Sequence, residues 1–103
     1  MPVILHPHSD FHQVMVKHPE GFEVILVKLD GVVHAYRNSC PHIGIGLDYG
    51  DGHCKHGERQ LICNMHGALF DADTGYCTDG PCSGDSLTRL RVAIDAAGRV
   101  VGL

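Results

Sequence analysis

Two short motifs combine residue types that ligate iron: Cys40-Pro41-His42 and Cys63-Asn64-Met65-His66-Gly67. Each offers one thiolate and one imidazole, and each lies where a predicted strand gives way to a turn. Thiolates are strong, soft donors to iron, whereas neutral imidazoles are weaker donors. A two-iron cluster bound by two of each therefore has one electron-poor iron and a higher reduction potential than an all-thiolate cluster. Two such loops can hold a cluster between them at the end of a β scaffold.

Other cysteines and histidines could supply the same site. Cys54-Lys55-His56 is a second Cys-x-His, next to His53, but only six residues separate it from Cys63. That span is short for two loops on opposite sides of a cluster, so we prefer the first motif and expect Cys54 in a surface loop. Cys77 and Cys82 are close enough in sequence to pair, although a reducing compartment favours free thiols. The remaining histidines are expected on the surface or on strand faces: His6, His8, His12, His18 and His34.

Two cysteines and two histidines are also a legitimate zinc set. Compact zinc modules generally combine Cys-x-x-Cys pairs with a helix, and both are absent from this pattern. A third interpretation is a β domain without any metal, in which these residues are incidental. The presence of all four residues in two ordered motifs counts against it.

The elements that must position these motifs are predicted to be strands. Alternating or continuous apolar runs, separated by Gly, Pro and Asp turn signals, occur from end to end of the chain, and no segment has a convincing helical period. Asp30-Gly31 predicts a hairpin turn, which gives a three-stranded meander before the first motif. We expect an all-β fold with strands at residues 11–17, 22–29, 32–37, 60–63, 68–71, 87–95 and 99–103. The runs at 60–63 and 68–71 flank residues 64–67, which predicts a second tight hairpin.

Length and composition narrow the class of protein. The chain has 103 residues, of which 44% are hydrophobic and 19% charged, which predicts one globular domain spanning residues 1–103 and not a disordered chain. Five cysteines without an evident secretory signal favour metal ligation over a disulfide framework. No apolar stretch approaches the ~20 residues that span a bilayer, so we expect a cytoplasmic protein that does not bind membranes.

The net charge of −4 is unevenly distributed. Residues 40–85 contain seven acidic residues against two basic ones, which leaves a charge of −5 there and +1 in the rest of the chain. This distribution disfavours nucleic-acid binding. It is compatible either with a solvated loop surface or with a docking face for a basic partner.

The motifs and their flanks resemble the Rieske family of [2Fe–2S] proteins. Cys-x-His, about twenty residues, then Cys-x-x-His-Gly is the signature of that family. Residues 38–42 resemble its first ligand loop, and residues 47–50 resemble the segment that follows this loop. Residues 65–71 resemble the second ligand loop, and Thr74-Gly75 with Gly80-Pro81 resembles the proline loop over the cluster. The resemblance covers nearly the whole chain.

This resemblance implies a Rieske-type antiparallel β sandwich or barrel base, with a smaller cluster-binding subdomain at about residues 39–85. It implies that Cys40 and Cys63 bind the inner iron, and that His42 and His66 bind the outer iron near the surface, where electrons would leave. Two thiolates cancel the net charge of two ferric ions and two sulfides, so the oxidised site is neutral. One-electron reduction then adds a single negative charge.

The sequence departs from the family pattern at several positions. The 20 residues between His42 and Cys63 form a longer loop than the soluble ferredoxin branch generally has, and Asn64 replaces a proline of that branch. The respiratory branch has a disulfide between its ligand loops and serine and tyrosine hydroxyls near the cluster. Here Ile45 and Met65 occupy the two disulfide positions, and Ala68 and Phe70 occupy the two hydroxyl positions. The bridge cannot form and the hydrogen bonds are lost, which lowers the expected reduction potential.

The resemblance therefore implies a low-potential electron carrier, which itself has no catalytic residues. It would pass electrons from a reductase to a terminal oxygenase of an aromatic-ring hydroxylating system. An oxygenase would need a further mononuclear iron site in a much larger domain. The alternatives are a subunit of a nitrite-reductase-like complex and a non-redox structural or regulatory module. We expect a monomer in isolation.

Overall fold

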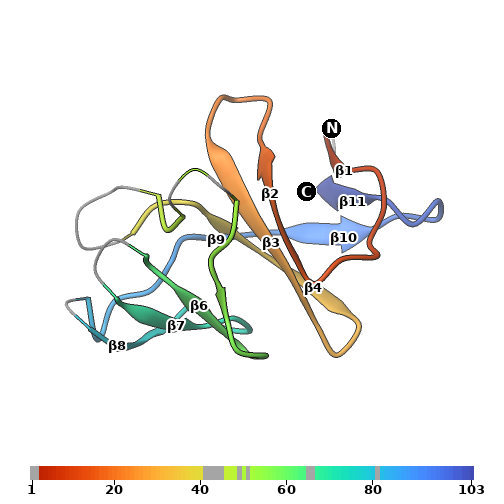
Figure 1. Ribbon diagram of the computed structural model, residues 1–103. Coiled ribbons are helices and arrows are strands. Elements are labelled where there is room, and N and C mark those ends of the chain that lie inside the picture. Colours follow the sequence, from red (N-terminus) through yellow and green to blue (C-terminus); the bar gives the residue numbers. More distant parts are fainter. Residues whose placement is uncertain (1–2, 41–45, 49, 51, 65–66, 81) are drawn as a thin grey trace.

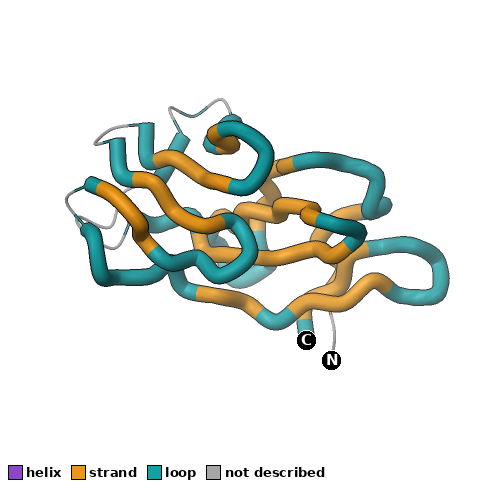
Figure 2. The backbone as a smooth tube through the Cα atoms, turned by 90° about the horizontal axis from the view of Figure 1, so that it is seen from below, coloured by secondary structure: helices purple, strands orange, loops and turns teal. Residues whose placement is uncertain are grey.

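The computed structural model describes residues 3–40, 46–48, 50, 52–64, 67–80 and 82–103. These residues form strands and turns, with no helix among them (Figure 2). In the part of the chain described, there is accordingly no helix that could cross a membrane. The strands are β1 (Val3–His6), β2 (Gln13–Lys17), β3 (Glu23–Leu29), β4 (Val32–Arg37), β5 (Lys55–His56), β6 (Gln60–Ile62), β7 (Leu69–Asp71), β8 (Cys77–Asp79), β9 (Arg89–Leu90), β10 (Val92–Ile94) and β11 (Val100–Gly102).

The strands form three antiparallel sheets, shown in Figure 1. The central sheet has the order β2-β3-β4-β9. The terminal sheet, β1-β11-β10, lies on one side of it and joins the two ends of the described chain. The cysteine sheet, β5-β6-β7-β8, lies on the other side. Cys40 comes shortly after β4, and Cys63 directly follows β6.

Strand β3 is buried on both faces. Its residues alternate between two separate apolar clusters. Val24 and Leu26 pack in the cluster beneath the terminal sheet, whereas Ile25 and Val27 pack in the cluster shared with the cysteine sheet. A strand covered on both sides has a continuous apolar run in its sequence instead of an alternating one. The central sheet is therefore the layer that fixes the other two sheets relative to each other.

The all-β expectation is confirmed, and so are the meander β2-β3-β4 and the hairpin β6-β7. Residues 87–95 were expected to form one strand, but the structure divides them at Arg91 into β9 and β10. The physical reason is that β9 pairs with β4 in the central sheet while β10 pairs with β11 in the terminal sheet. The chain changes sheets at this residue, as strands do at the corners of sandwiches. The sequence pattern also missed β1, β5 and β8, which are only two to four residues long.

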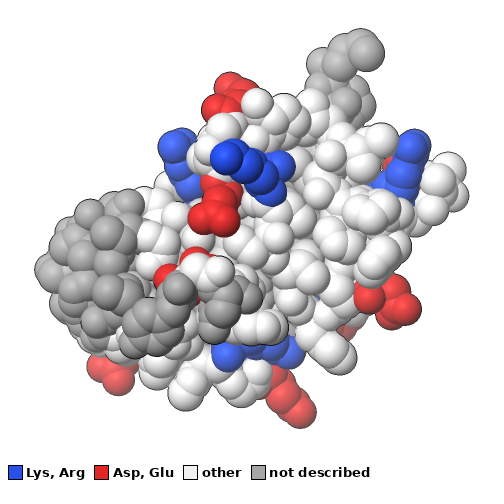
Figure 3. Space-filling view, turned by 45° about the horizontal axis from the view of Figure 1, so that its top comes forward, with Lys and Arg blue, Asp and Glu red and all other residues white. Residues whose placement is uncertain are grey.

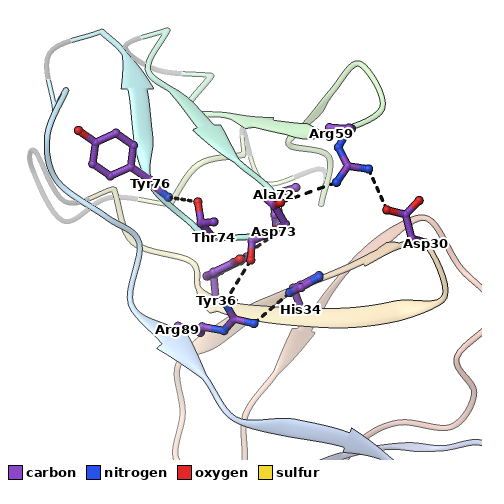
Figure 4. Close-up of polar contacts among 9 residues, drawn as sticks. All are labelled: Asp30, His34, Tyr36, Arg59, Ala72, Asp73, Thr74, Tyr76 and Arg89. Atoms are coloured by element: carbon purple, nitrogen blue, oxygen red, sulfur yellow. Dashed lines mark hydrogen bonds and ion pairs between the residues drawn. The ribbon is translucent and has the colours of Figure 1, made fainter.

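Tyr36 links the central sheet to the cysteine sheet. Its buried hydroxyl donates a hydrogen bond of 2.8 Å to the carbonyl oxygen of Ala72 (Figure 4). The ring also lies against Gly75, where a Cβ atom would come within 2.7 Å of the Tyr36 ring. Gly75 has a φ of +78°, so a side chain there would meet both backbone strain and a clash. This close packing holds the turn after β7 on the central sheet.

Two arginines add polar links across the same boundary (Figure 4). Arg59 of the cysteine sheet's turn lies 3.0 Å from Asp30 and 3.7 Å from Asp73. Arg89 of β9 donates to the Asp73 carbonyl oxygen at 3.1 Å and lies 3.1 Å from Nδ1 of His34. Burial, and next the charge of Arg89, lower the pKa of His34. These contacts are exposed and each contributes little, so the buried Tyr36 contact is the stronger link.

Replacing Tyr36 with Phe is expected to lower the free energy of unfolding by about 1 kcal/mol at neutral pH, because the Ala72 carbonyl loses its buried partner. Burial raises the pKa of Tyr36 to about 12, from 10.0 for an ordinary tyrosine. Since the unfolded chain loses this proton first, the stability that Tyr36 provides is complete below pH 10 and is lost as the pH rises toward 12. Urea denaturation on either side of pH 10 measures both effects.

The control is Tyr76→Phe, because the Tyr76 side chain is 47% exposed and its removal should leave stability and alkaline sensitivity nearly unchanged. If Tyr36→Phe matched this control in both respects, the Tyr36 link would contribute nothing measurable.

Candidate metal centre

The structure brings Cys40 and Cys63 into one buried cluster of apolar side chains. Cys40 follows β4, Cys63 follows β6, and both side chains are fully buried. Leu47 and Phe70 belong to the same cluster. The other two predicted ligands, His42 and His66, lie outside the described residues.

The first ligand loop is closed by Asn38. Its side-chain oxygen accepts the backbone N–H of Leu47 at 2.7 Å, and its Nδ2 donates to Asp48 at 3.0 Å. Asp48 in turn accepts the backbone N–H groups of Gly50 and Gly52 at 3.1 and 2.9 Å. Burial favours a higher pKa for Asp48, but the hydrogen bonds from Asn38 and the glycine backbones outweigh it and lower the pKa. Asn38 and Asp48 therefore join the start of this loop to the residues that follow it.

The described ends of the second predicted ligand loop are held to each other and to the first loop. The backbone N–H of Cys63 donates to the Ala68 carbonyl at 2.8 Å, and the Gly67 N–H donates back to the Cys63 carbonyl at 2.7 Å. Asn64 connects the two loops, because its backbone N–H and its Nδ2 both donate to the Leu47 carbonyl, at 2.8 and 3.2 Å. Its Nδ2 also lies 3.0 Å from the His53 carbonyl. A proline here would lose the backbone donor and the side-chain donor together.

The third loop, between β8 and β9, packs on the second. A Cβ atom on Gly80 would lie 2.7 Å from the Cα atom of Ala68, and Gly80 has a φ of +99°. A side chain at this position would therefore displace backbone, and only glycine allows the approach. On either side of Gly80 are Cys77 and Cys82, both buried in the same cluster as Cys40. The predicted neighbour Pro81 lies outside the described residues.

The expectation that Cys54 lies in a surface loop is wrong. Its side chain is 1% exposed and packs in the cluster with Cys40 and Cys63. Cys54 immediately precedes β5, and its carbonyl accepts the Ile62 N–H at 2.7 Å, so pairing with β6 turns the side chain inward. His56, the other half of this second Cys-x-His motif, is exposed, so the structure buries the cysteine of this motif but not its histidine.

The charges near the site are partly used within the protein. Asp48 closes the first loop, and Asp73 lies near Arg59 and beside Arg89. On the face drawn in Figure 3, basic and acidic side chains are interspersed among the described residues. At least three of the seven acidic side chains of the stretch make contacts within the protein, since Asp79 also accepts the Gly80 N–H at 2.9 Å.

The donors present fit an iron–sulfur cluster. Two thiols from separate loops are buried together, and iron–sulfur clusters are bound by cysteine thiolates in apolar, hydrogen-bonded surroundings. No group of three or more His, Cys, Asp or Glu side chains gathers as a metal site within the described ranges, which exclude both predicted histidine ligands.

The role of Asn64 and the burial of Cys54 and Cys82 were not found from sequence. The sequence did contain one signal for Asn64: it is a polar residue directly beside the predicted ligand Cys63.

Comparisons with known proteins agree with this geometry. A family profile described as "Rieske [2Fe-2S] domain" matches residues 5–93. Apoptosis-inducing factor 3 from Homo sapiens is 37% identical over 73 residues, which are 71% of this chain and 11% of that protein. Oxidoreductase NdmD from Pseudomonas putida is 32% identical over 77 residues, or 74% of this chain and 12% of that protein. The chain thus spans only about a tenth of the length of these relatives.

Solved structures show the same fold. The ferredoxin of Sphingomonas yanoikuyae B1 superposes with a TM-score of 0.78 at 24% identity, covering 99% of this chain and 97% of that one. The ferredoxin of carbazole 1,9a-dioxygenase from Nocardioides aromaticivorans IC177 gives 0.75 at 25% identity, covering 99% and 96%. The terminal oxygenase of carbazole 1,9a-dioxygenase from Novosphingobium sp. KA1 gives 0.77 at 28% identity, covering all of this chain and 29% of that one.

Replacing Asn64 with Asp keeps the size of the side chain but removes both amide donors and places a carboxylate beside two carbonyls. We expect the free energy of unfolding to fall by about 1–3 kcal/mol, and the iron content after purification to fall with it. The matched control is Gln60→Glu, the same change at an amide whose side-chain contact is exposed and 3.5 Å long. Equal behaviour of the two variants would mean that Asn64 does not hold the loops together.

Proposed function

The chain belongs to the Rieske [2Fe–2S] domain family, and from this premise we propose that it carries single electrons through a cluster bound by Cys40, His42, Cys63 and His66. The family membership confirms the expected [2Fe–2S] cofactor and decides against zinc or a metal-free site. The observation that supports this ligand set best is the joint burial of Cys40 and Cys63, whose loops are tied to each other through Asn64 and Leu47.

When bound, the cluster supplies a one-electron couple. The chain's own residues supply its ligands and its surroundings. Cys40 and Cys63 donate thiolates from a cluster of side chains that excludes water, and this exclusion helps to set the potential. In this proposal His42 and His66 bind the outer iron, and their rings form the exit path for the electron. The subdomain at about residues 39–85 is the part that holds the cofactor, and the whole chain acts as one domain.

The surroundings of the two cysteines support a low potential. Ala68 and Phe70 are fully buried in the same cluster and carry no hydroxyl that could donate to a sulfur. Hydrogen bonds to the sulfurs stabilise the extra negative charge of the reduced state, so their loss lowers the potential. Ile45 and Met65, which exclude the inter-loop disulfide by their chemistry, lie outside the described residues.

We propose redox proteins as partners, a reductase as donor and a terminal oxygenase as acceptor. Two observations support this. The chain superposes along nearly its full length on a ferredoxin of carbazole 1,9a-dioxygenase, and the same fold occurs in a structure described as a complex of reduced oxygenase and oxidised ferredoxin. Matching segments also occur within much longer proteins such as oxidoreductase NdmD, so the donor can be another domain as well as another protein. The cytoplasmic location and the monomeric state remain predictions.

The ligand assignment is tested by replacing His42 or His66 with Ala. Each change removes one ligand of the outer iron, so we expect the visible absorption of the cluster and its reversible one-electron reduction to be lost. The controls are His53→Ala and His56→Ala, which remove the histidines next to the second Cys-x-His motif and should leave both signals intact. Iron and sulfide analysis together with a redox titration measures the outcome. Loss of the cluster in the controls but not in the first pair would overturn the assignment.

The low potential is tested by restoring a hydroxyl near Cys63. Ala68→Ser places a donor on the residue whose carbonyl accepts the Cys63 N–H, and we expect the reduction potential to rise by about 20–60 mV, the equivalent of one hydrogen bond. Ala72→Ser is the control, because Ala72 is equally buried in the same cluster but belongs to the turn beneath Tyr36. A potential unchanged by Ala68→Ser, or raised equally by both, would show that the missing hydroxyl does not set the potential.

A further inference from the structure

Two thiols that the proposed ligand set does not use face each other beside the site. The sulfur atoms of Cys77 and Cys82 are 3.1 Å apart, and the two side chains are 0% and 2% exposed. Cys54, the third buried thiol outside the ligand set, is 1% exposed and serves as the comparison for the pair. A disulfide bond is about 2.05 Å long, so closure requires the two sulfurs to approach by only about 1 Å.

The loop that contains the pair is already closed at its base. The Cys77 N–H donates to the Asp85 carbonyl at 2.8 Å, and the Asp85 N–H donates to the Cys82 carbonyl at 2.9 Å. These bonds hold the backbone on both sides of the pair, so a disulfide would link segments that the fold has already brought together. The Cys77 thiol also donates a hydrogen bond of 3.3 Å to the carbonyl oxygen of Asp79, at the other end of β8.

An oxidant can reach the pair through a small movement. Residues 83–86, directly after Cys82, are exposed, and segments with few buried side chains open at low free-energy cost. Transient opening of this short loop, in which the Asp85 hydrogen bonds break, would uncover Cys82 without separating the three sheets, and closure would bring the two sulfurs together again. The pair is therefore buried in the closed state but close to a surface segment.

We propose that Cys77 and Cys82 are a redox-active dithiol, which a low-molecular-weight disulfide such as oxidised glutathione converts into an intramolecular disulfide within the folded protein. One cysteine sulfur attacks the oxidant, which forms a mixed disulfide and releases one reduced glutathione. The second cysteine sulfur then attacks the mixed disulfide and releases the other. Two S–H bonds are lost and one S–S bond is formed, while two electrons and two protons are transferred to the two glutathione molecules.

The pair shares its buried cluster with a proposed cluster ligand, because Cys40 packs in the same group of side chains. In the dithiol state the pair places two S–H groups in these surroundings. Oxidation removes both hydrogens, so the surroundings of the iron–sulfur cluster lose two donors and its reduction potential should fall. This consequence rests on the proposed function, whereas disulfide formation does not.

The experiment uses the purified holoprotein, equilibrated without air in glutathione buffers of increasing oxidised-to-reduced ratio. Iron and sulfide are measured first. The protein is then denatured with a chelator, alkylated and mapped by mass spectrometry. We expect the number of alkylated cysteines to fall from five to three, since the chain has five cysteines, with the missing pair at Cys77 and Cys82.

The variants Cys77→Ala and Cys82→Ala should lose no thiols, whereas Cys54→Ala, the matched buried control, should still lose two. Because the wild-type map reads the pair directly, the test does not depend on either variant folding. Five alkylated cysteines at every ratio, a stable mixed disulfide, or a bond to Cys40 or Cys54 would overturn the proposal.

A redox titration of the cluster before and after oxidation tests the consequence. We expect a lower potential in oxidised wild-type protein and no shift in oxidised Cys82→Ala. An unchanged potential alongside a mapped Cys77–Cys82 disulfide would overturn the coupling to the iron–sulfur cluster but not the dithiol. Absence of iron at the first step would instead count against the proposed function, and the thiol count would still decide the dithiol.

Discussion

The burial of the central sheet on both faces is the constraint on which the rest of the structure depends. Strand β3 supplies alternate residues to two apolar clusters, so it must be covered by one sheet on each side. The terminal sheet covers one face and joins the ends of the described chain, and the cysteine sheet covers the other. Because burial of apolar area is the main stabilising contribution to folding, the cysteine sheet and its loops are held in place by the same packing that stabilises the domain.

The position of the two cysteines follows from that arrangement. The cluster beneath the cysteine sheet contains Cys40 and Cys63 as well as the apolar residues of β3, so the site is an extension of the core. Polar contacts then set the loops with finer precision. Asn38 and Asp48 close the first loop, and Asn64 ties the second loop to Leu47. Packing brings the loops to the same place, and these hydrogen bonds fix the distance between them.

Much of this could be predicted from sequence, for identifiable reasons. Long apolar runs and turn signals gave the meander and the β6-β7 hairpin, because such patterns depend on local chemistry. The two motifs and their flanks predicted the cofactor through their resemblance to the Rieske family, since two cysteines and two histidines by themselves also fit zinc. The burial of Cys54 was missed because β5, which follows it, has only two residues and shows no pattern. The sheet change at Arg91 was missed because it depends on the pairing of β9 with β4, which is distant in sequence. The bridge from Asn64 to Leu47 was missed for the same reason: nothing local indicates which carbonyl an amide will meet.

The most direct test of the account is the low-temperature EPR spectrum of the protein purified without air and reduced with dithionite. A cluster with two cysteine and two histidine ligands should give a rhombic signal with the low average g value of a histidine-ligated iron, because one iron lacks thiolate ligands. A signal typical of an all-cysteine cluster would contradict the account and implicate the other buried thiols, Cys54, Cys77 and Cys82, as ligands. Protein without iron would contradict it altogether.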